Sequence, residues 1–181
     1  MLKPSVLEKL NEQIGRELYS SHFYLQMSGW CAAQGLDGCA AFLRKHSQEE
    51  LSHMYRLFDY VLQSDAQPLI PALEAPPHEF ESVKDVFRQV HEHEQAITGW
   101  INELVQTTFE AQDYFTFNFL QWYVAEQHEE EALARTILDR LELIGLEDRG
   151  LYFFDADLGR LARGENPESL LAGGAEADGN A

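Results

Sequence analysis

The chain has 181 residues, and its 45% of hydrophobic and 12% of aromatic residues exclude wholesale disorder. Asp and Glu number 31 against 13 Lys and Arg, so the formal net charge of -18 disfavours nucleic-acid partners and anionic membrane surfaces. Two cysteines, the lack of a signal-peptide pattern and the lack of an apolar stretch long enough to span a bilayer favour a cytoplasmic protein with no membrane partner.

Helical periodicity and its breaks divide most of the chain into four long segments. Counting their N-caps, we predict helices over about residues 5–34, 38–63, 82–111 and 114–144, each about 40–45 Å long at 1.5 Å per residue. Ser5 and Glu8 have the spacing of a capping box, which predicts Ser5 as the first N-cap. Ser82 is the expected third N-cap, whereas Gly35 and Gly145 should follow the ends of the first and fourth helices.

The connections predict how these helices are arranged. Short turns join the first pair and the last pair, so each pair should form an antiparallel hairpin. The Pro-rich segment 64–81 could extend to roughly 60 Å, which is enough to run the length of a helix and return the chain to the other end. An all-α four-helix bundle with one long crossover is therefore expected. Residues 148–162 predict a short fifth helix that completes a domain over 1–163, and 164–181 predict a disordered acidic tail.

Each long helix carries a carboxylate near the middle of its otherwise apolar face. The four are Glu17, Glu50, Glu94 and Glu130, with His53 three residues after Glu50 and Gln127 three residues before Glu130. Taken singly, each could be an error of register. Together they lie at similar distances from the turns, so antiparallel packing brings them to one level of the core. Burying ionised carboxylates costs several kcal/mol each unless they are compensated, and bound cations are the economical compensation.

An internal repeat supports a shared site. Thirty-three residues separate Glu17 from Glu50, and the same number separates Glu94 from Gln127. His53 and Glu130 then follow at the same offset of three. Oxygen-rich ligands with one imidazole suit iron, manganese or zinc. The arrangement is that of a di-metal carboxylate bundle in which Gln127-x-x-Glu130 replaces the second Glu-x-x-His.

These residues and three longer stretches resemble the bacterial non-haem ferritins over about residues 1–163. The stretches are Leu18-Tyr-Ser-Ser, Gln48-Glu-Glu-Leu-Ser-His and Asn118-Phe-Leu-Gln-Trp-Tyr-Val-Ala-Glu-Gln-His-Glu-Glu-Glu. The resemblance implies a homo-oligomeric hollow shell of 24 subunits. Such a shell is a ferroxidase: it oxidises Fe(II) with O₂ or H₂O₂ at a buried di-iron centre and stores Fe(III) oxide-hydroxide.

The resemblance also implies roles for individual residues. One iron would be held by Glu17, Glu50 and His53, and the second by Glu50, Glu94 and Glu130, with Gln127 beside it. Tyr24 would lie next to the centre. A third iron site, leading toward the cavity of the shell, would be formed by Glu49, Glu126 and Glu129 with a share of Glu130.

Other interpretations remain open at this point. A haem-containing relative would have a methionine before the site histidine, where this chain has Ser52, so no haem is expected. A DNA-protecting mini-ferritin would lack the fifth helix and often carry a basic tail. A di-iron oxidase or peroxidase that stores nothing is the main alternative function. His46 is expected to be a hydrogen-bonded core residue rather than a ligand, and Trp122 and Tyr123 are expected to serve packing.

Overall fold

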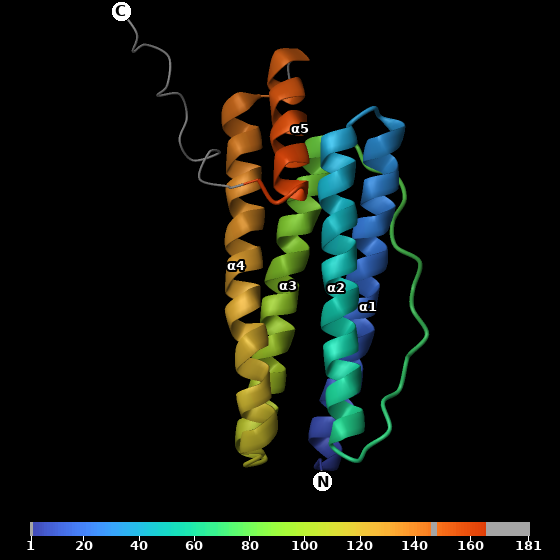
Figure 1. Cartoon of the computed structure of the whole chain (residues 1–181), viewed down its shortest axis with the longest axis vertical. Coiled ribbons are helices and arrows are strands. Elements are labelled where there is room, and N and C mark those ends of the chain that lie inside the picture. The colour runs from blue at the N-terminus through green and yellow to red at the C-terminus, as the bar shows by residue number, and fades with distance from the viewer. Residues whose placement is uncertain (1, 146–147, 166–181) are drawn as a thin grey trace, which may run out of the picture.

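The computed structural model describes residues 2–145 and 148–165 and shows a bundle of four long helices with a fifth, shorter one (Figure 1). The helices are α1 (Pro4–Ala33), α2 (Asp37–Gln63), α3 (Val83–Glu110), α4 (Tyr114–Ile144) and α5 (Asp148–Ala162). The predicted all-α fold is confirmed, because the described residues contain only helices, turns and loops. None of the described helices is long and apolar enough to cross a membrane. The tail predicted to be disordered lies, from residue 166 onward, outside the described residues.

The helix ends agree with the sequence in most places. The Ser82 hydroxyl accepts a hydrogen bond from the backbone N–H of Asp85 at 3.2 Å, which confirms it as an N-cap. Gly145 follows α4 with φ of 77°, a left-handed conformation that favours glycine. The predicted capping by Ser5 is wrong: α1 begins at Pro4 with Lys3 as its N-cap. Proline is favoured at the first helical position because its fixed φ suits the helix and its missing N–H needs no partner there.

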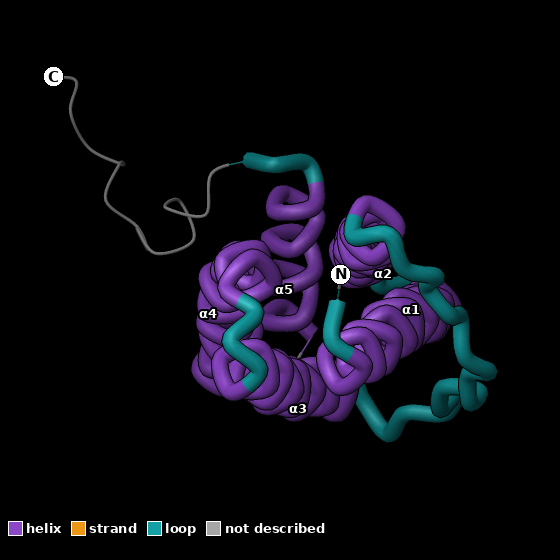
Figure 2. Tube along the Cα trace, turned by 90° about the horizontal axis from the view of Figure 1, so that it is seen from below, coloured by secondary structure: helices purple, strands orange, loops and turns teal. Residues whose placement is uncertain are grey.

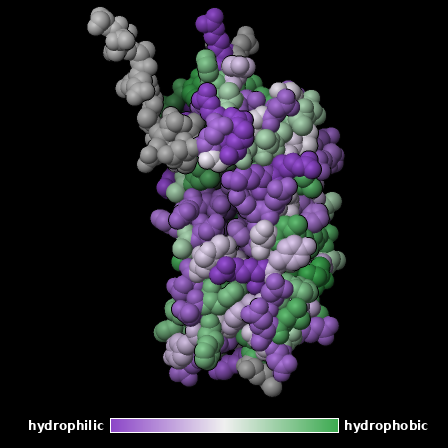
Figure 3. Space-filling view, in the orientation of Figure 1, coloured by the Kyte–Doolittle hydropathy of each residue, from purple (hydrophilic) through white to green (hydrophobic). Residues whose placement is uncertain are grey.

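The crossover between α2 and α3 runs along the outside of α1 for most of its length (Figure 1). Two contacts fasten it there. The backbone N–H of Leu69 donates to Asn11 Oδ1 at 2.9 Å. Pro71 lies so close to Gly15 that a Cβ on this glycine would meet Pro71 Cγ at 2.5 Å. The loop therefore runs mostly outside the bundle, and near its end Phe80 is buried in the apolar core. In the space-filling view, hydrophilic residues prevail across the middle of the face shown (Figure 3).

The core consists of two apolar clusters separated by a polar layer. One cluster, which includes Met27, Leu43 and Phe87, extends to α5. The other, which includes Leu10, Leu57 and Leu104, fills the opposite half of the bundle. Buried polar side chains lie between them: Gln13, Glu17, Glu50, Glu94 and Gln127. Apolar burial on both sides holds the helices together, so this layer does not need to stabilise the fold.

The fifth helix is anchored to the start of α2. Leu36, the N-cap of α2, provides no side-chain cap, and Asp155 of α5 takes that role instead. Its carboxylate accepts hydrogen bonds from the backbone N–H of Gly38 at 3.1 Å and of Cys39 at 2.8 Å. A Cβ on Gly38 would lie 1.8 Å from the Asp155 carbonyl oxygen, so only glycine permits this approach. Viewed along the bundle, α5 lies between α2 and α4 (Figure 2).

We expect Asp155→Ala to lower the free energy of unfolding by about 1 kcal/mol, the usual cost of losing an N-cap. Thermal unfolding followed by circular dichroism measures the change. Asp139→Ala, which removes an exposed carboxylate on α4, is the control. Equal melting temperatures for the two variants would contradict the capping role of Asp155.

Candidate metal centre

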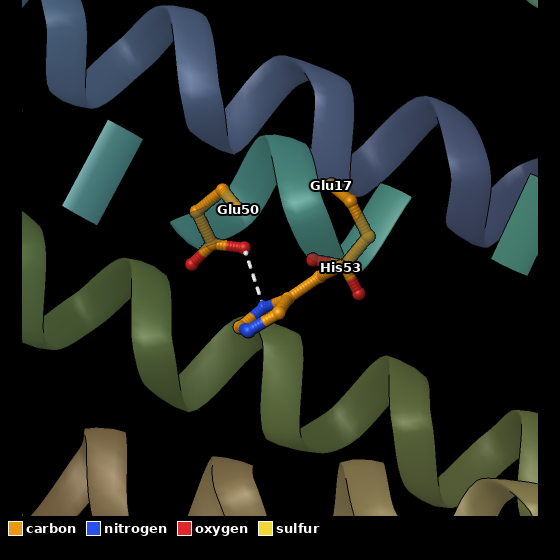
Figure 4. A group of neighbouring side chains, drawn as sticks. All are labelled: Glu17, Glu50 and His53. Atoms are coloured by element: carbon orange, nitrogen blue, oxygen red, sulfur yellow. Dashed lines mark ion pairs between the residues drawn. The ribbon is translucent and has the colours of Figure 1, made fainter. Parts of the chain in front are cut away.

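The polar layer holds the first group of predicted ligands at one point of the bundle axis. Glu17 comes from α1, and Glu50 and His53 come from α2, where a spacing of three puts both on one helix face. Each residue offers one ligand atom, and these atoms all lie within 4.8 Å of one another. His53 Nδ1 lies 3.4 Å from Glu50 Oε2 (Figure 4). Glu17 and Glu50 are only 1% and 4% exposed, so solvent is largely excluded from these two carboxylates.

The second group surrounds Glu94 on α3, which is 2% exposed. The Tyr24 hydroxyl donates a hydrogen bond to Glu94 Oε1. Gln127 Nε2 donates to Glu94 Oε2 at 2.6 Å and to the Glu94 carbonyl oxygen at 3.1 Å. Tyr24 and Gln127 therefore both lie beside Glu94, and both act as donors that orient this carboxylate.

The pKa values in this layer reflect the cost of packing acids together. Burial, followed by the charge of Glu50, raises the pKa of Glu17 well above its ordinary value. Burial and the charge of Glu94 raise the pKa of Glu50 in the same way. Burial raises the pKa of Glu94 to about 7, although its hydrogen bonds from Tyr24 and Gln127 act in the opposite direction. Without a nearby positive charge, these carboxylates therefore hold their protons more tightly than ordinary glutamates do.

One atom of this layer has no hydrogen-bond partner. Glu50 Oε2 is fully buried and makes no hydrogen bond, although His53 lies nearby. A buried polar atom without a partner costs about 1–3 kcal/mol. Carboxylate oxygens with one imidazole are suitable donors for iron, manganese or zinc. The donor set and the unpaired oxygen both fit a metal ion.

A neighbouring group contains a residue that the sequence did not assign to the site. His46 on α2 lies 3.3 Å from Glu130 Oε2 and 3.6 Å from Glu49 Oε2 through its Nδ1. Ligand atoms of these three residues all lie within 4.8 Å of one another. Burial alone would lower the pKa of His46, but its hydrogen bond to Glu130 and the charges of the nearby carboxylates outweigh burial and raise it. His46 has a partner, as expected of a core histidine, but the partner is a predicted ligand.

The other two acids of the predicted third site lie at the edge of this group. Glu126 is half-buried and Glu129 is exposed. Burial raises the pKa of Glu126, and the charges of Glu130, Glu129 and Glu49 add to the increase. These acids are therefore close enough to interact, but the metal-sized groups among the described residues do not include Glu126 or Glu129.

Aromatic residues close the side of the centre near His53. The Tyr123 hydroxyl donates to the His53 carbonyl oxygen at 2.7 Å, and this tyrosine is 2% exposed. The Trp122 ring lies 5.3 Å from the His53 ring, and the guanidinium of Arg56 lies 4.2 Å above Trp122. Tyr123 packs in the core as expected, whereas Trp122 is half-buried beneath a surface cation.

Comparisons with known proteins agree with this geometry. Residues 7–144 match the family described as ferritin-like domain. A bacterial non-heme ferritin from Escherichia coli O6:H1 is 53% identical over 161 residues, covering 89% of this chain and 98% of that protein. One from Campylobacter jejuni is 46% identical over 162 residues, covering 90% and 97%. An open pore ferritin of Archaeoglobus fulgidus matches with a TM-score of 0.86 and 42% identity over 88% of this chain and 98% of that one.

Proposed function

The chain belongs to the ferritin family, and from this premise we propose that it oxidises Fe(II) at the buried carboxylate layer and stores the Fe(III) product. Iron is both substrate and cargo in this account. The observation that carries it is the layer itself: three carboxylates at most 4% exposed, drawn from three helices, beside one imidazole. Burying these carboxylates together destabilises the fold, so packing alone does not explain their presence.

Two adjacent metal positions follow from the contacts. Glu17, Glu50 and His53 would hold one Fe(II). Glu50 interacts electrostatically with both Glu94 and Glu130, which suits a carboxylate that bridges to a second Fe(II). O₂ or H₂O₂ would take electrons from the pair, and the carboxylates would offset the growing metal charge. Tyr24 and Gln127 would hold Glu94 in place by their hydrogen bonds.

We place the third site where His46, Glu49 and Glu130 meet, with Glu126 and Glu129 beside it. Glu130 is shared with the second position, and the exposed Glu129 gives the site access to solvent. A cation could therefore pass from the centre to the surface along carboxylates alone. His46 would add a nitrogen ligand to this path, which the acids by themselves do not provide.

Replacing Glu49, Glu126 and Glu129 together by Ala should leave the binding of two Fe(II) per subunit intact and change the O₂ consumed per iron. The reason is that these acids serve the iron that follows the first pair. Oxygen-electrode measurements during stepwise Fe(II) addition give the ratio. If the ratio and the rates of later additions matched the wild type, these acids would be no more than a solvated surface.

The mass of the particle and the amount of iron that it retains distinguish iron storage from Fe(II) oxidation alone. A shell of 24 subunits of 20.7 kDa would have a mass of roughly 500 kDa. Aerobic loading with Fe(II), followed by sizing and iron analysis, should give that mass and many irons per subunit. A small particle that oxidises Fe(II) but retains only a few irons would favour the alternative, a di-iron oxidase or peroxidase without storage.

A further inference from the structure

An apolar groove lies between α4 and α5. Its volume is about 200 Å³, and Leu133 and Ile137 of α4 with Phe154 and Leu158 of α5 form much of its wall. α5 occupies the seam between α2 and α4, where the two long helices do not pack backbone against backbone (Figure 2). The groove therefore lies beside the seam between α2 and α4.

A second, smaller cavity lies inside the bundle. Its volume is about 10 Å³, room for about one water-sized molecule. On one side it reaches Tyr24, Glu94 and Glu130, which belong to the proposed iron centre. Its remaining wall consists of His46 and of the apolar residues Phe42, Leu43, Val90, Leu133, Ala134 and Ile137. The cavity therefore has residues of the proposed iron centre on one side and mainly apolar side chains on the other.

The groove and the cavity share two residues. Leu133 and Ile137 line both, so two aliphatic side chains separate the outer groove from the cavity beside Glu94. Leu133 is only half-buried, whereas Ile137 is 4% exposed. Exposed side chains change rotamer on the picosecond-to-nanosecond timescale, so Leu133 is the residue of the shared wall that can move more readily.

The chemistry of this path differs from that of the acidic surface near Glu129. A hydrated cation would pay a large desolvation cost in an apolar passage, and H₂O₂ would lose hydrogen bonds to water. O₂ is small, uncharged and apolar, and incurs neither cost. The acidic side suits Fe(II), whereas the apolar side suits O₂.

We propose that O₂ reaches the iron centre through the groove between α4 and α5, past Leu133 and Ile137, into the cavity beside Tyr24 and Glu94. This proposal rests on the proposed function and specifies its oxidant. The path gives the two substrates separate access. Iron moves along carboxylates, whereas O₂ arrives through the apolar half of the core.

Leu133→Phe tests the path by adding bulk to the shared wall. We expect the KM for O₂ in Fe(II) oxidation to rise several-fold, with little change in kcat at saturating O₂. Oxidation driven by H₂O₂ should keep the wild-type rate in the same variant. Stopped-flow absorbance at a series of O₂ and H₂O₂ concentrations gives these values.

Two further variants complete the design. Leu138→Phe is the matched control, because Leu138 is also half-buried against the same apolar cluster but lines neither space. Its KM for O₂ should equal that of the wild type. Ala134→Val narrows the inner cavity alone and should also raise the KM for O₂. If Leu133→Phe fails to assemble, Ala134→Val decides the test.

Several outcomes would overturn the path. An unchanged KM for O₂ in the assembled Leu133→Phe and Ala134→Val variants is one, and an equal loss of O₂-driven and H₂O₂-driven rates is another. The proposed O₂ path would also be contradicted if the wild-type protein oxidised Fe(II) with H₂O₂ but not with O₂. Slow oxidation by both oxidants in the wild type would instead contradict the proposed function, and this proposal with it.

Discussion

Glu50→Ala should slow the initial oxidation of Fe(II) by orders of magnitude while the particle keeps its size. Glu50 lies between the two proposed iron positions, so its loss removes a ligand from both. The fold should survive, because the two apolar clusters on either side of the layer carry the packing. Stopped-flow absorbance of the ferric product after the first Fe(II) addition measures the rate.

His53→Ala should show the same loss, since His53 is the only imidazole of the first group. Glu103→Ala is a suitable control, because it removes an exposed carboxylate of α3 far from any predicted ligand in the sequence. Wild-type oxidation rates in both Glu50→Ala and His53→Ala would mean that the centre lies elsewhere.

The metal-free Glu17→Gln variant should be more stable than the metal-free wild type, and the difference should grow with pH. Burial, and then the charge of Glu50, raises the pKa of Glu17 well above 4.5. The folded state therefore binds its proton more tightly than the unfolded state. Stability is lost as pH rises from about 4.5 through the raised pKa. The stabilising effect of the substitution should therefore be smallest at acidic pH and largest at alkaline pH.

Thermal unfolding of metal-free protein at acidic and alkaline pH tests this expectation. Glu8→Gln, an exposed change on the same helix, should have almost no effect at either pH. Adding Zn²⁺, which does not undergo oxidation, should stabilise the wild type more than Glu17→Gln, because only an intact site binds it tightly. A Glu17→Gln variant that melts below the wild type at alkaline pH without metal would show that the carboxylate serves the fold.

Periodicity predicted the fold because the helices are long and their breaks carry strong signals. Gly145 stands where a left-handed residue is needed, and Ser82 stands where an orphan N–H needs an acceptor. The start of α1 was harder to predict, because Pro4 and Ser5 are adjacent and both are good N-terminal residues. The anchoring of α5 by Asp155 could not be predicted at all. It joins residues 117 positions apart.

The candidate centre was predictable for a different reason. Similar distances from the turn between α1 and α2 place Glu17 beside Glu50, and a spacing of three places His53 on the same face. His46 has the same spacing of three from Glu49, which was a usable signal. Its meaning depends on Glu130, which approaches from another helix. The apolar cavity depends on how four helices leave space between them, and no local pattern encodes that.

The most direct test of the central claim is a crystal structure of this protein soaked anaerobically with Fe(II) and measured at the iron absorption edge. We expect two strong anomalous peaks in the buried layer, one in contact with Glu17, Glu50 and His53 and the other with Glu50, Glu94 and Glu130. A weaker third peak is expected beside His46 and Glu49. Anomalous density only at exposed carboxylates, with none between Glu17 and Glu94, would contradict the assignment of this layer as the iron centre.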